Sequence, residues 1–208
     1  MESEDAIAAP LTTNEDLHGN VPDDSPAAIL IVDMINDLEF PGAEALFEAA
    51  LPAAKRIAEL KRRACAAGIP AIYVNDNFGK WRSDFRCQVR HCLDHPVRGR
   101  PIARLLEPAE EDYYVLKPKH SGFYATPLDL LLAYLKATTV ILTGITADDC
   151  VTFTAGDAFI REYRLIVPAD CIASESPART ARSLEWISEA LDADVRPSIE
   201  IDVGSLRR

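Results

Sequence analysis

Apolar and polar positions alternate along the chain between two kinds of segment. The first kind is a short run of apolar, mostly β-branched residues, which is typical of a buried strand. Five such runs, and a weaker sixth, occupy residues 27–34, 70–76, 113–117, 138–145, 165–170 and 198–203. Because the runs are nearly continuous, they favour strands that are buried on both faces, as in a parallel sheet covered by helices.

The second kind of segment carries apolar residues at the spacing of a helix. Four stretches show this spacing: 44–67, 126–136, 150–162 and 177–191. Pro52 is a candidate start for a second helical segment, while Thr126 and Pro127 suit an N-cap and a first helical position. Strands and helices therefore alternate. This predicts an α/β protein with a three-layer α/β/α, Rossmann-like fold and a mostly parallel sheet of five or six strands.

Length and composition fit one domain. The chain has 208 residues, of which 48% are hydrophobic and 26% charged, so it can bury a core without disulfides or a structural metal. Residues 1–25 are polar and acidic, and we expect a flexible tail ahead of one domain over residues 26–208. No apolar run could span a bilayer and no secretory signal is recognisable, which predicts a cytoplasmic protein without a membrane partner.

The charge pattern excludes one class of partner. The chain has 33 acidic and 22 basic residues, for a net charge of −11. Seven of the acids lie in residues 1–25, which hold no Lys or Arg, so the rest of the chain carries −4. An acidic chain repels the phosphate backbone, so we expect no nucleic-acid partner. The five cysteines are an odd number without a CxxC pair, and we expect free thiols.

The segment over residues 77–112 breaks the alternation. It contains no clear strand, and between Lys80 and Arg104 it holds seven basic residues against two acidic ones. A connection of this length inside a compact domain is usually functional, for example a lid or a subunit interface. A solvated basic loop is the alternative. An anionic substrate and a subunit interface explain the basic residues equally well.

A cluster of cysteines and histidines lies in this same segment, at Cys87, His91, Cys92 and His95. Structural zinc sites normally show CxxC-type pairs, or histidines four residues apart with further ligands at longer range. His91 and His95 alone meet the helical spacing, so we expect no metal here. The plainer interpretation is part of a lid or of a subunit contact.

Polar residues follow three of the apolar runs where packing does not explain them. Asp33 ends the first run, Lys117 ends the third, and Cys150 lies five residues beyond Ile145 at the expected start of a helix. Reactive groups gather at the carboxyl ends of parallel strands, so adjacent strands would bring the three side chains together. Singly, each has a plain alternative: a strand end, a surface charge or a small buried hydrophobe.

Together the three residues suit attack on a carbonyl carbon. Cysteine is nucleophilic as a thiolate, which a helix N-terminus or a nearby cation favours. Asp33 would take the thiol proton and deliver it to a leaving amine, while Lys117 would hold the carboxylate ionised. Backbone N–H groups in the turn over residues 144–150 would form an oxyanion hole. The attack gives a thioester, which water then hydrolyses.

Three motifs around these residues carry a family resemblance. They are IVDMIND at residues 31–37, LKPKHSGF at 116–123 and TGITADDCV at 143–151. In this order and spacing, the chain resembles the isochorismatase-like cysteine hydrolase superfamily over about residues 27–173.

The resemblance implies a catalytic site and an activity. The catalytic triad would be Asp33, Lys117 and Cys150. A cis peptide bond would join Ile145 to Thr146, and the amides of Thr146 and Cys150 would bind the oxyanion. The expected activity is hydrolysis of the C–N bond of a small-molecule amide, ureide or carbamoyl substrate through a thioester, with no metal or organic cofactor. Homo-oligomers are usual for the family, so we expect one here.

The sequence departs from the family pattern at two places. Ile35 and Leu38 stand where the first motif often has Gln and Phe, which leaves the substrate contacts of that Gln open. Residues 75–81 contain no histidine, whereas nicotinamidases of the superfamily hold a metal there with two, so we expect no nicotinamidase. True isochorismatases lack the nucleophilic cysteine, so Cys150 favours amide chemistry.

Further candidates surround the three residues. Asn77, Trp81 and Phe123 are candidate walls of a substrate pocket, although a core role explains Phe123 equally well. Lys119 is a candidate supporting charge. Two alternatives to the amidohydrolase stay open. One is an isochorismatase-type vinyl ether hydrolase, which would tolerate the loss of Cys150, and the other is a non-catalytic small-molecule-binding or thiol redox-sensing protein.

Overall fold

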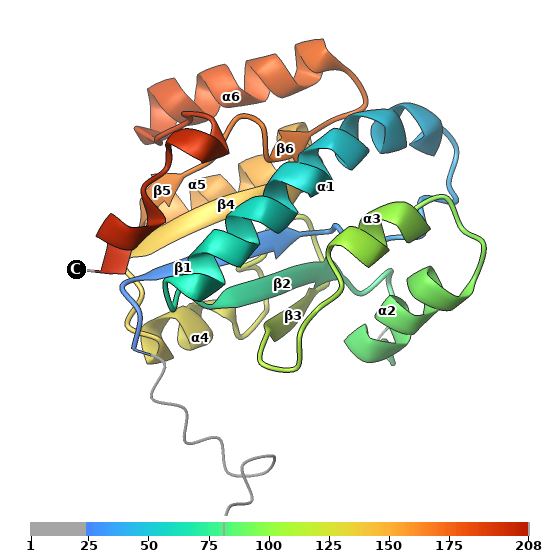
Figure 1. Cartoon of the computed structure of the whole chain (residues 1–208). Coiled ribbons are helices and arrows are strands. Elements are labelled where there is room, and N and C mark those ends of the chain that lie inside the picture. The colour runs from blue at the N-terminus through green and yellow to red at the C-terminus, as the bar shows by residue number, and fades with distance from the viewer. Residues whose placement is uncertain (1–23, 81, 208) are drawn as a thin grey trace, which may run out of the picture.

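A six-stranded parallel sheet forms the centre of the molecule (Figure 1). The structure, a computed structural model, describes residues 24–80 and 82–207. The strands are β1 (Ala27–Val32), β2 (Ala71–Asp76), β3 (Tyr113–Lys117), β4 (Thr139–Ile145), β5 (Arg164–Ile166) and β6 (Ile172–Ala173). They run in the order β3-β2-β1-β4-β5, with β6 paired to β4, and every pairing between these strands is parallel. The fold predicted from the sequence is confirmed.

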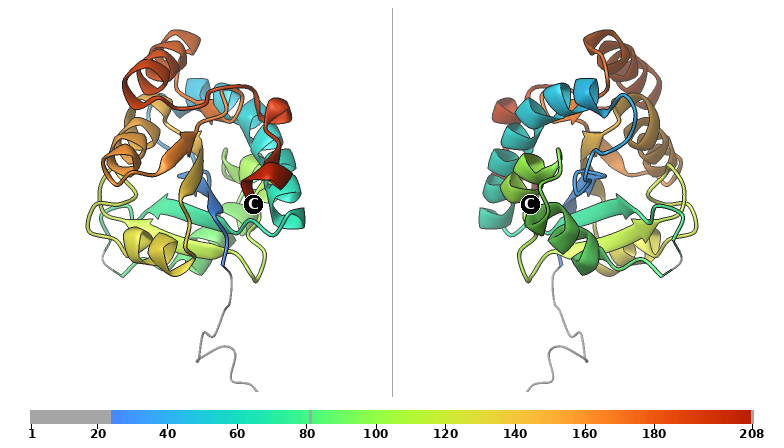
Figure 2. Two further views of the ribbon diagram at one scale, coloured as in Figure 1. Left: turned by 90° about the vertical axis from the view of Figure 1, so that its left-hand side faces the viewer. Right: turned by 90° about the vertical axis from the view of Figure 1, so that its right-hand side faces the viewer.

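Helices cover both faces of this sheet (Figure 2). They are α1 (Ala43–Ala66), α2 (Phe85–Asp94), α3 (Arg100–Leu105), α4 (Leu128–Tyr134), α5 (Thr152–Ile160) and α6 (Pro177–Leu191). One core cluster joins the sheet to α1, α2 and α3, and a second joins its other face to α4, α5 and α6. Among the residues described, no helix combines the length and apolar character that a membrane crossing needs.

Strand β1 shows why the apolar runs are continuous. Ile29 and Ile31 belong to the core cluster on one face, whereas Leu30 and Val32 belong to the cluster on the other, and all four are fully buried. Since successive side chains of a strand point to opposite faces, a sheet covered twice needs apolar residues at every position.

Helix α1 is a single helix, which corrects the expectation of a second segment at Pro52. Proline removes one N–H donor from the helix, leaving the carbonyl four residues earlier, that of Glu48, without its usual partner. Pro52 and Glu48 both lie on the exposed side of α1, where water can reach that carbonyl. The buried positions on both sides of Pro52 keep one helical face on the sheet.

The sixth predicted strand, over residues 198–203, is wrong. Residues Ser198–Glu200 form a 3-10 turn, because the amide and hydroxyl of Ser198 donate to the carboxylate of Asp170 at 2.7 and 2.8 Å. The sixth strand is instead β6, which follows Cys171 and pairs with the end of β4. The described residues between 77 and 112 form no strand, as expected, but include the short helices α2 and α3.

Candidate active site

The structure brings Asp33, Lys117 and Cys150 together at the carboxyl ends of the strands. The Lys117 Nζ lies 2.8 Å from Asp33 Oδ2 and donates to Cys150 Sγ at 3.3 Å. The sequence predicted that the strands carrying these residues are adjacent. They are not all adjacent, because β2 separates β1 from β3. Lys117 is fully buried, and its long side chain reaches past the end of β2 to the aspartate. The length of lysine therefore makes up for the intervening strand.

Asp33 is held in one orientation by the end of β2. Its backbone N–H donates to the carbonyl of Val74 at 3.0 Å, and its Oδ1 accepts from the N–H of Asp76 at 2.7 Å. Its φ of 52° is left-handed, a conformation that aspartate tolerates better than most residues and that ends the strand here. The second carboxylate oxygen is left to face Lys117.

Asp76 is a site residue that the sequence reasoning missed. Its carboxylate lies 3.7 Å from the Lys117 Nζ, so two acids flank the buried cation. The signal was present, since Asp76 ends an apolar run in the same way as Asp33. The position of β2 between β1 and β3 is what brings it into the site.

Cys150 is positioned by the close approach of β4 to β1. A Cβ at Gly144 would lie 2.1 Å from the carbonyl oxygen of Val32, and Gly144 has a φ of 120°, so no other residue fits there without displacing the backbone. The peptide bond between Ile145 and Thr146 is cis, as predicted. A single π-helical turn, Ala147–Val151, then carries Cys150 to the Lys117 amine.

Burial and charge set the protonation of the three groups. Burial raises the pKa of Asp33 above its ordinary value, and Lys117 offsets part of that effect. Burial alone would lower the pKa of Lys117, but the adjacent Asp33 and Cys150 hold it above its ordinary value. Burial, followed by the charge of Asp33, raises the pKa of the Cys150 thiol. The raised pKa of the Cys150 thiol favours its protonated form.

Other predicted residues have more varied places. Asn77 is buried and shapes a turn, since its Oδ1 accepts from the N–H of Gly79 at 2.8 Å. Phe123 belongs to the core, with the guanidinium of Arg161 4.8 Å from its ring centroid. Lys119 is exposed, and within the described part of the chain it forms no ion pair with the triad. Trp81 lies outside the described residues. Substrate contacts of these residues stay predictions.

His120 contacts Cys150, and sequence reasoning missed it. Its Nδ1 lies 3.9 Å from Cys150 Sγ and 3.1 Å from Asp149 Oδ1. Its ring stacks on Phe153, with centroids 5.6 Å apart and an interplanar angle of 24°. The residue stands three positions after Lys117 in the second motif, and Asp149 directly precedes the cysteine, so the motifs themselves held the signal.

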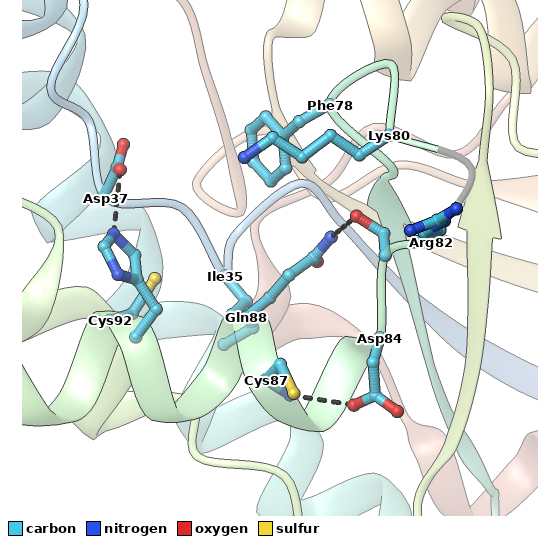
Figure 3. Close-up of a pocket in the computed structure, with 11 residues that line it drawn as sticks. Ile35, Asp37, Phe78, Lys80, Arg82, Asp84, Cys87, Gln88 and Cys92 are labelled. Carbon is cyan, nitrogen blue, oxygen red and sulfur yellow. Dashed lines mark hydrogen bonds and ion pairs between the residues drawn. The ribbon is translucent and has the colours of Figure 1, made fainter.

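A cavity of about 450 Å³ lies beside these strand ends (Figure 3). It is bounded by the segment after β1, the loop after β2 and helix α2, through Ile35, Asp37, Phe78, Lys80, Arg82, Ser83, Asp84, Cys87, Gln88, His91 and Cys92. The Gln88 amide donates to the backbone carbonyl of Asp76 at 3.1 Å, which ties the cavity wall to the end of β2. The cavity thus adjoins the strand end that flanks Lys117.

The acidic and basic groups around this cavity differ in their contacts. Asp37 pairs with His91 at 3.1 Å, and Asp84 accepts from the N–H of Cys87 at 2.9 Å. Lys80 and Arg82, in contrast, form no ion pair with any described residue. The acidic groups are thus already engaged, whereas the two basic groups can meet a ligand.

The Cys/His cluster does not form a compact set of ligands. Cys87 is exposed and Cys92 is buried, while the His91 and His95 rings lie tilted to each other at 37°, with their centroids 4.9 Å apart. Across residues 24–80 and 82–207, no three His, Cys, Asp or Glu side chains gather closely enough to hold a metal ion.

Comparison with known proteins identifies the family. The family model for the isochorismatase domain matches residues 27–195. The chain belongs to the isochorismatase-like hydrolase family. Among its curated relatives is the isochorismatase family protein YaaI of Bacillus subtilis strain 168, which is 38% identical over 174 residues, 84% of this chain and 95% of the relative.

Two further relatives are named for C–N bond hydrolysis. The N-carbamoylsarcosine amidase from Thermoplasma acidophilum, whose crystal structure is known, shares 30% sequence identity with this chain. The two structures match with a TM-score of 0.65 over 85% of this chain and 98% of that one. The ureidoacrylate amidohydrolase RutB of Methylobacterium radiotolerans is 42% identical over 78 residues, 38% of this chain and 30% of that protein. These likenesses within the family support a hydrolase that acts on C–N bonds.

Proposed function

We propose that this member of the isochorismatase-like family is a cysteine-dependent amidohydrolase of small amides, ureides or carbamoyl compounds. The observation that carries the proposal is the contact of the Lys117 amine with both Asp33 and the Cys150 sulfur, at 2.8 and 3.3 Å. A nucleophile and a base joined through one buried cation are the parts that covalent acyl transfer requires.

The reaction follows from the positions of these groups. Asp33 takes the thiol proton, and the Cys150 sulfur forms a bond to the substrate carbonyl carbon. The backbone N–H groups of Thr146 and Cys150 stabilise the oxyanion. Asp33 then gives the proton to the leaving nitrogen, the C–N bond breaks, and a thioester remains. Asp33 next takes a proton from water, which attacks the thioester, and the sulfur leaves with that proton to restore the thiol.

Lys117 stabilises the negative charges that arise during the proton transfers. Its buried positive charge stabilises the carboxylate of Asp33 and each thiolate that forms beside it. The raised pKa of Cys150 means that the thiol gives up its proton when Asp33 and an electrophilic carbonyl are both in place. The acid limb of kcat/KM should accordingly lie above pH 3.8, the ordinary pKa of an aspartate, because that of Asp33 is raised.

The adjoining cavity supports a small substrate with an anionic group. A volume of about 450 Å³ is within the usual range for small-ligand sites. Lys80 and Arg82, whose charges are not engaged by described residues, would bind a carboxylate placed away from the scissile bond. Carbamoyl and ureido acids combine both features, in keeping with the names of the N-carbamoylsarcosine amidase and ureidoacrylate amidohydrolase relatives.

Ammonia release from a panel of small amides, ureides and carbamoyl acids tests this function. We expect turnover by the wild type, and a loss of roughly a thousandfold or more in Cys150→Ala, because the variant lacks the thiol that forms the thioester. Cys65→Ala is the matched control, since Cys65 is an exposed thiol at the end of α1 and should be dispensable.

Two outcomes would contradict the proposal. Turnover that survives in Cys150→Ala would transfer the chemistry to another group and favour an ether hydrolase. Silence of the wild type across the panel, together with ready oxidation of Cys150, would favour a thiol sensor.

A further inference from the structure

Two nitrogen groups contact the Cys150 sulfur, one from the buried side and one from the exposed side. Lys117 is fully buried and lies 3.3 Å from the sulfur. The His120 side chain is 56% exposed, and its Nδ1 lies 3.9 Å from the same atom, near the outer limit for a hydrogen bond to sulfur. The mechanism proposed above uses the lysine and leaves the histidine without a task.

The contacts of His120 decide which way its hydrogen bonds run. Both the Asp149 carboxylate and the Cys150 sulfur approach the same nitrogen, Nδ1. An ionised carboxylate can only accept a hydrogen bond, so Nδ1 must carry the hydrogen. A nitrogen that already carries a hydrogen cannot take the proton of the thiol. His120 is therefore not the base of a Cys–His–Asp relay through Nδ1. Its one Nδ1 hydrogen is shared between the Asp149 carboxylate at 3.1 Å and the Cys150 sulfur at 3.9 Å.

The surroundings of the sulfur give such a donor a role. Asp33 disfavours a negative charge on the sulfur, and Asp149 lies on the same turn as the cysteine. The positive charge of Lys117 is shared with Asp33 and Asp76, which lie 2.8 and 3.7 Å from its amine. One cation thus serves two carboxylates and a sulfur.

We propose that His120, oriented by Asp149, shares its Nδ1 hydrogen between that carboxylate and the Cys150 sulfur, and so stabilises the thiolate from the exposed side of the site. This inference rests on the proposed function, in which that sulfur is the nucleophile. Stacking on Phe153 keeps the imidazole ring over the first turn of α5, so that the ring and the cysteine stay in register.

Alkylation of Cys150 by iodoacetamide, followed against pH by peptide-resolved mass spectrometry, tests the proposal without any substrate. The thiolate is the form that reacts, so the labelling rate reports its population. In His120→Ala we expect labelling at neutral pH to fall roughly three- to tenfold and the midpoint of the pH profile to rise. The exposed Cys65 and Cys87 in the same samples are internal references, and their rates should not change.

Two further variants separate the hydrogen bond from the bulk of the ring. In His120→Asn the side-chain N–H can take the place of the Nδ1 hydrogen, so labelling should stay within about twofold of the wild type. His95→Ala makes the same substitution at another exposed histidine, and it should have no effect on Cys150. Circular dichroism shows that each variant is folded before it is labelled.

Asp149→Ala tests whether the aspartate acts through His120. Removing a nearby negative charge should by itself favour the thiolate, whereas releasing the ring should disfavour it. We therefore expect Asp149→Ala to be more harmful, or less helpful, to labelling when His120 is present than in the His120→Ala background. Equal effects in both backgrounds would show that the two residues are not coupled.

The inference is overturned if His120→Ala leaves the pH profile of Cys150 unchanged. It is also overturned if His120→Asn is as slow as His120→Ala, since the ring rather than its N–H would then matter. These results would leave the ammonia test with Cys150→Ala intact. Conversely, a wild type that releases no ammonia would contradict the hydrolase and leave the labelling result readable.

Discussion

The strand-end triad and the segment carrying α2 and α3 lie at the same end of the sheet but are built in different ways (Figure 1). Asp33 and Lys117 extend directly from strands whose residues fill the core, and both are buried. Helix α2 buries just Phe85 and Cys92. Polar contacts help to place it, such as His91 with Asp37 and the Gln88 amide with the Asp76 carbonyl.

In the proposed reaction, this difference separates the reacting groups from the groups that would select the substrate. A nucleophile and its base must keep their geometry within a fraction of an ångström, which strands packed on both faces provide. A segment with few buried apolar contacts opens at a lower free-energy cost than the core does. It can therefore change its lining residues, or move, without disturbing the chemistry beside it.

Breaking the buried pair should have the largest effect. Lys117→Met leaves the Asp33 carboxylate buried without its cation, and losses of this kind cost about 3–5 kcal/mol of unfolding free energy. Adding Asp33→Asn should recover part of the loss, since it removes the orphaned charge. Urea denaturation at pH 7 measures both. If the unfolding free energy of Lys117→Met lay within 1 kcal/mol of the wild-type value, Lys117 and Asp33 would not be a tightly coupled pair.

The same variant should show a defined pH dependence. The pKa of Lys117 is raised, so its contribution to stability is present below its ordinary value of 10.5 and is lost as pH rises through the higher value in the folded protein. The pKa of Asp33 is also raised, so burying this acid is least costly at low pH, where it is protonated. The stability gap between wild type and Lys117→Met should be small near pH 4, wider at pH 7 and narrower above pH 10.5.

Two neighbouring arginines test the role of the α2 segment in substrate selection. Both arginines belong to the same basic stretch of the sequence. Arg82 lines the cavity at the end of β2, whereas Arg86 lines a separate depression that includes Glu107 and Asp112. Arg82→Ala should raise KM for an anionic amide roughly three- to tenfold more than for a neutral one. Arg86→Ala should change both by less than about twofold. Equal selectivity changes in the two variants would argue for a long-range field instead.

Local patterns were sufficient for strands β1 to β5 and for the place of Asp33 and Lys117 at strand ends. Continuous apolar runs mark buried parallel strands, and a polar residue that interrupts such a run at its end needs a reason other than packing, which is how Asp33 and Lys117 stand out. The order of strands in a sheet depends on contacts between distant segments, so the place of β2 between β1 and β3 could not be predicted from local sequence patterns. The role of Asp76 beside Lys117 follows from that order.

Long-range contacts explain the remaining errors. Residues 198–203 alternate like a strand, but Asp170, distant in sequence, binds both the amide and the hydroxyl of Ser198 and turns the chain there. Helix α2 is short and largely polar, so its apolar period is weak. The clearest local indication of this helix is Asp84, because its side chain caps the N-terminus of α2.

The smallest expected effects come from the N-caps of two helices, one in the α2 segment and one in the core. Asp84 caps α2 and Ser176 caps α6, where their side chains accept from backbone N–H groups at 2.9 and 3.4 Å. Helix α6 belongs to the core layer, so Ser176→Ala should lower the global unfolding free energy by about 1 kcal/mol and leave KM unchanged.

Asp84→Ala should leave global stability nearly unchanged, because α2 can fray while the sheet stays folded. Its amides should exchange several-fold faster with solvent, and KM for a neutral amide should rise about twofold. Asp84→Asn keeps the cap without the charge and should resemble the wild type. If Asp84→Ala instead lowered global stability as much as Ser176→Ala, then α2 would unfold together with the core, and the separation of a rigid triad from a loosely held selecting segment would not hold.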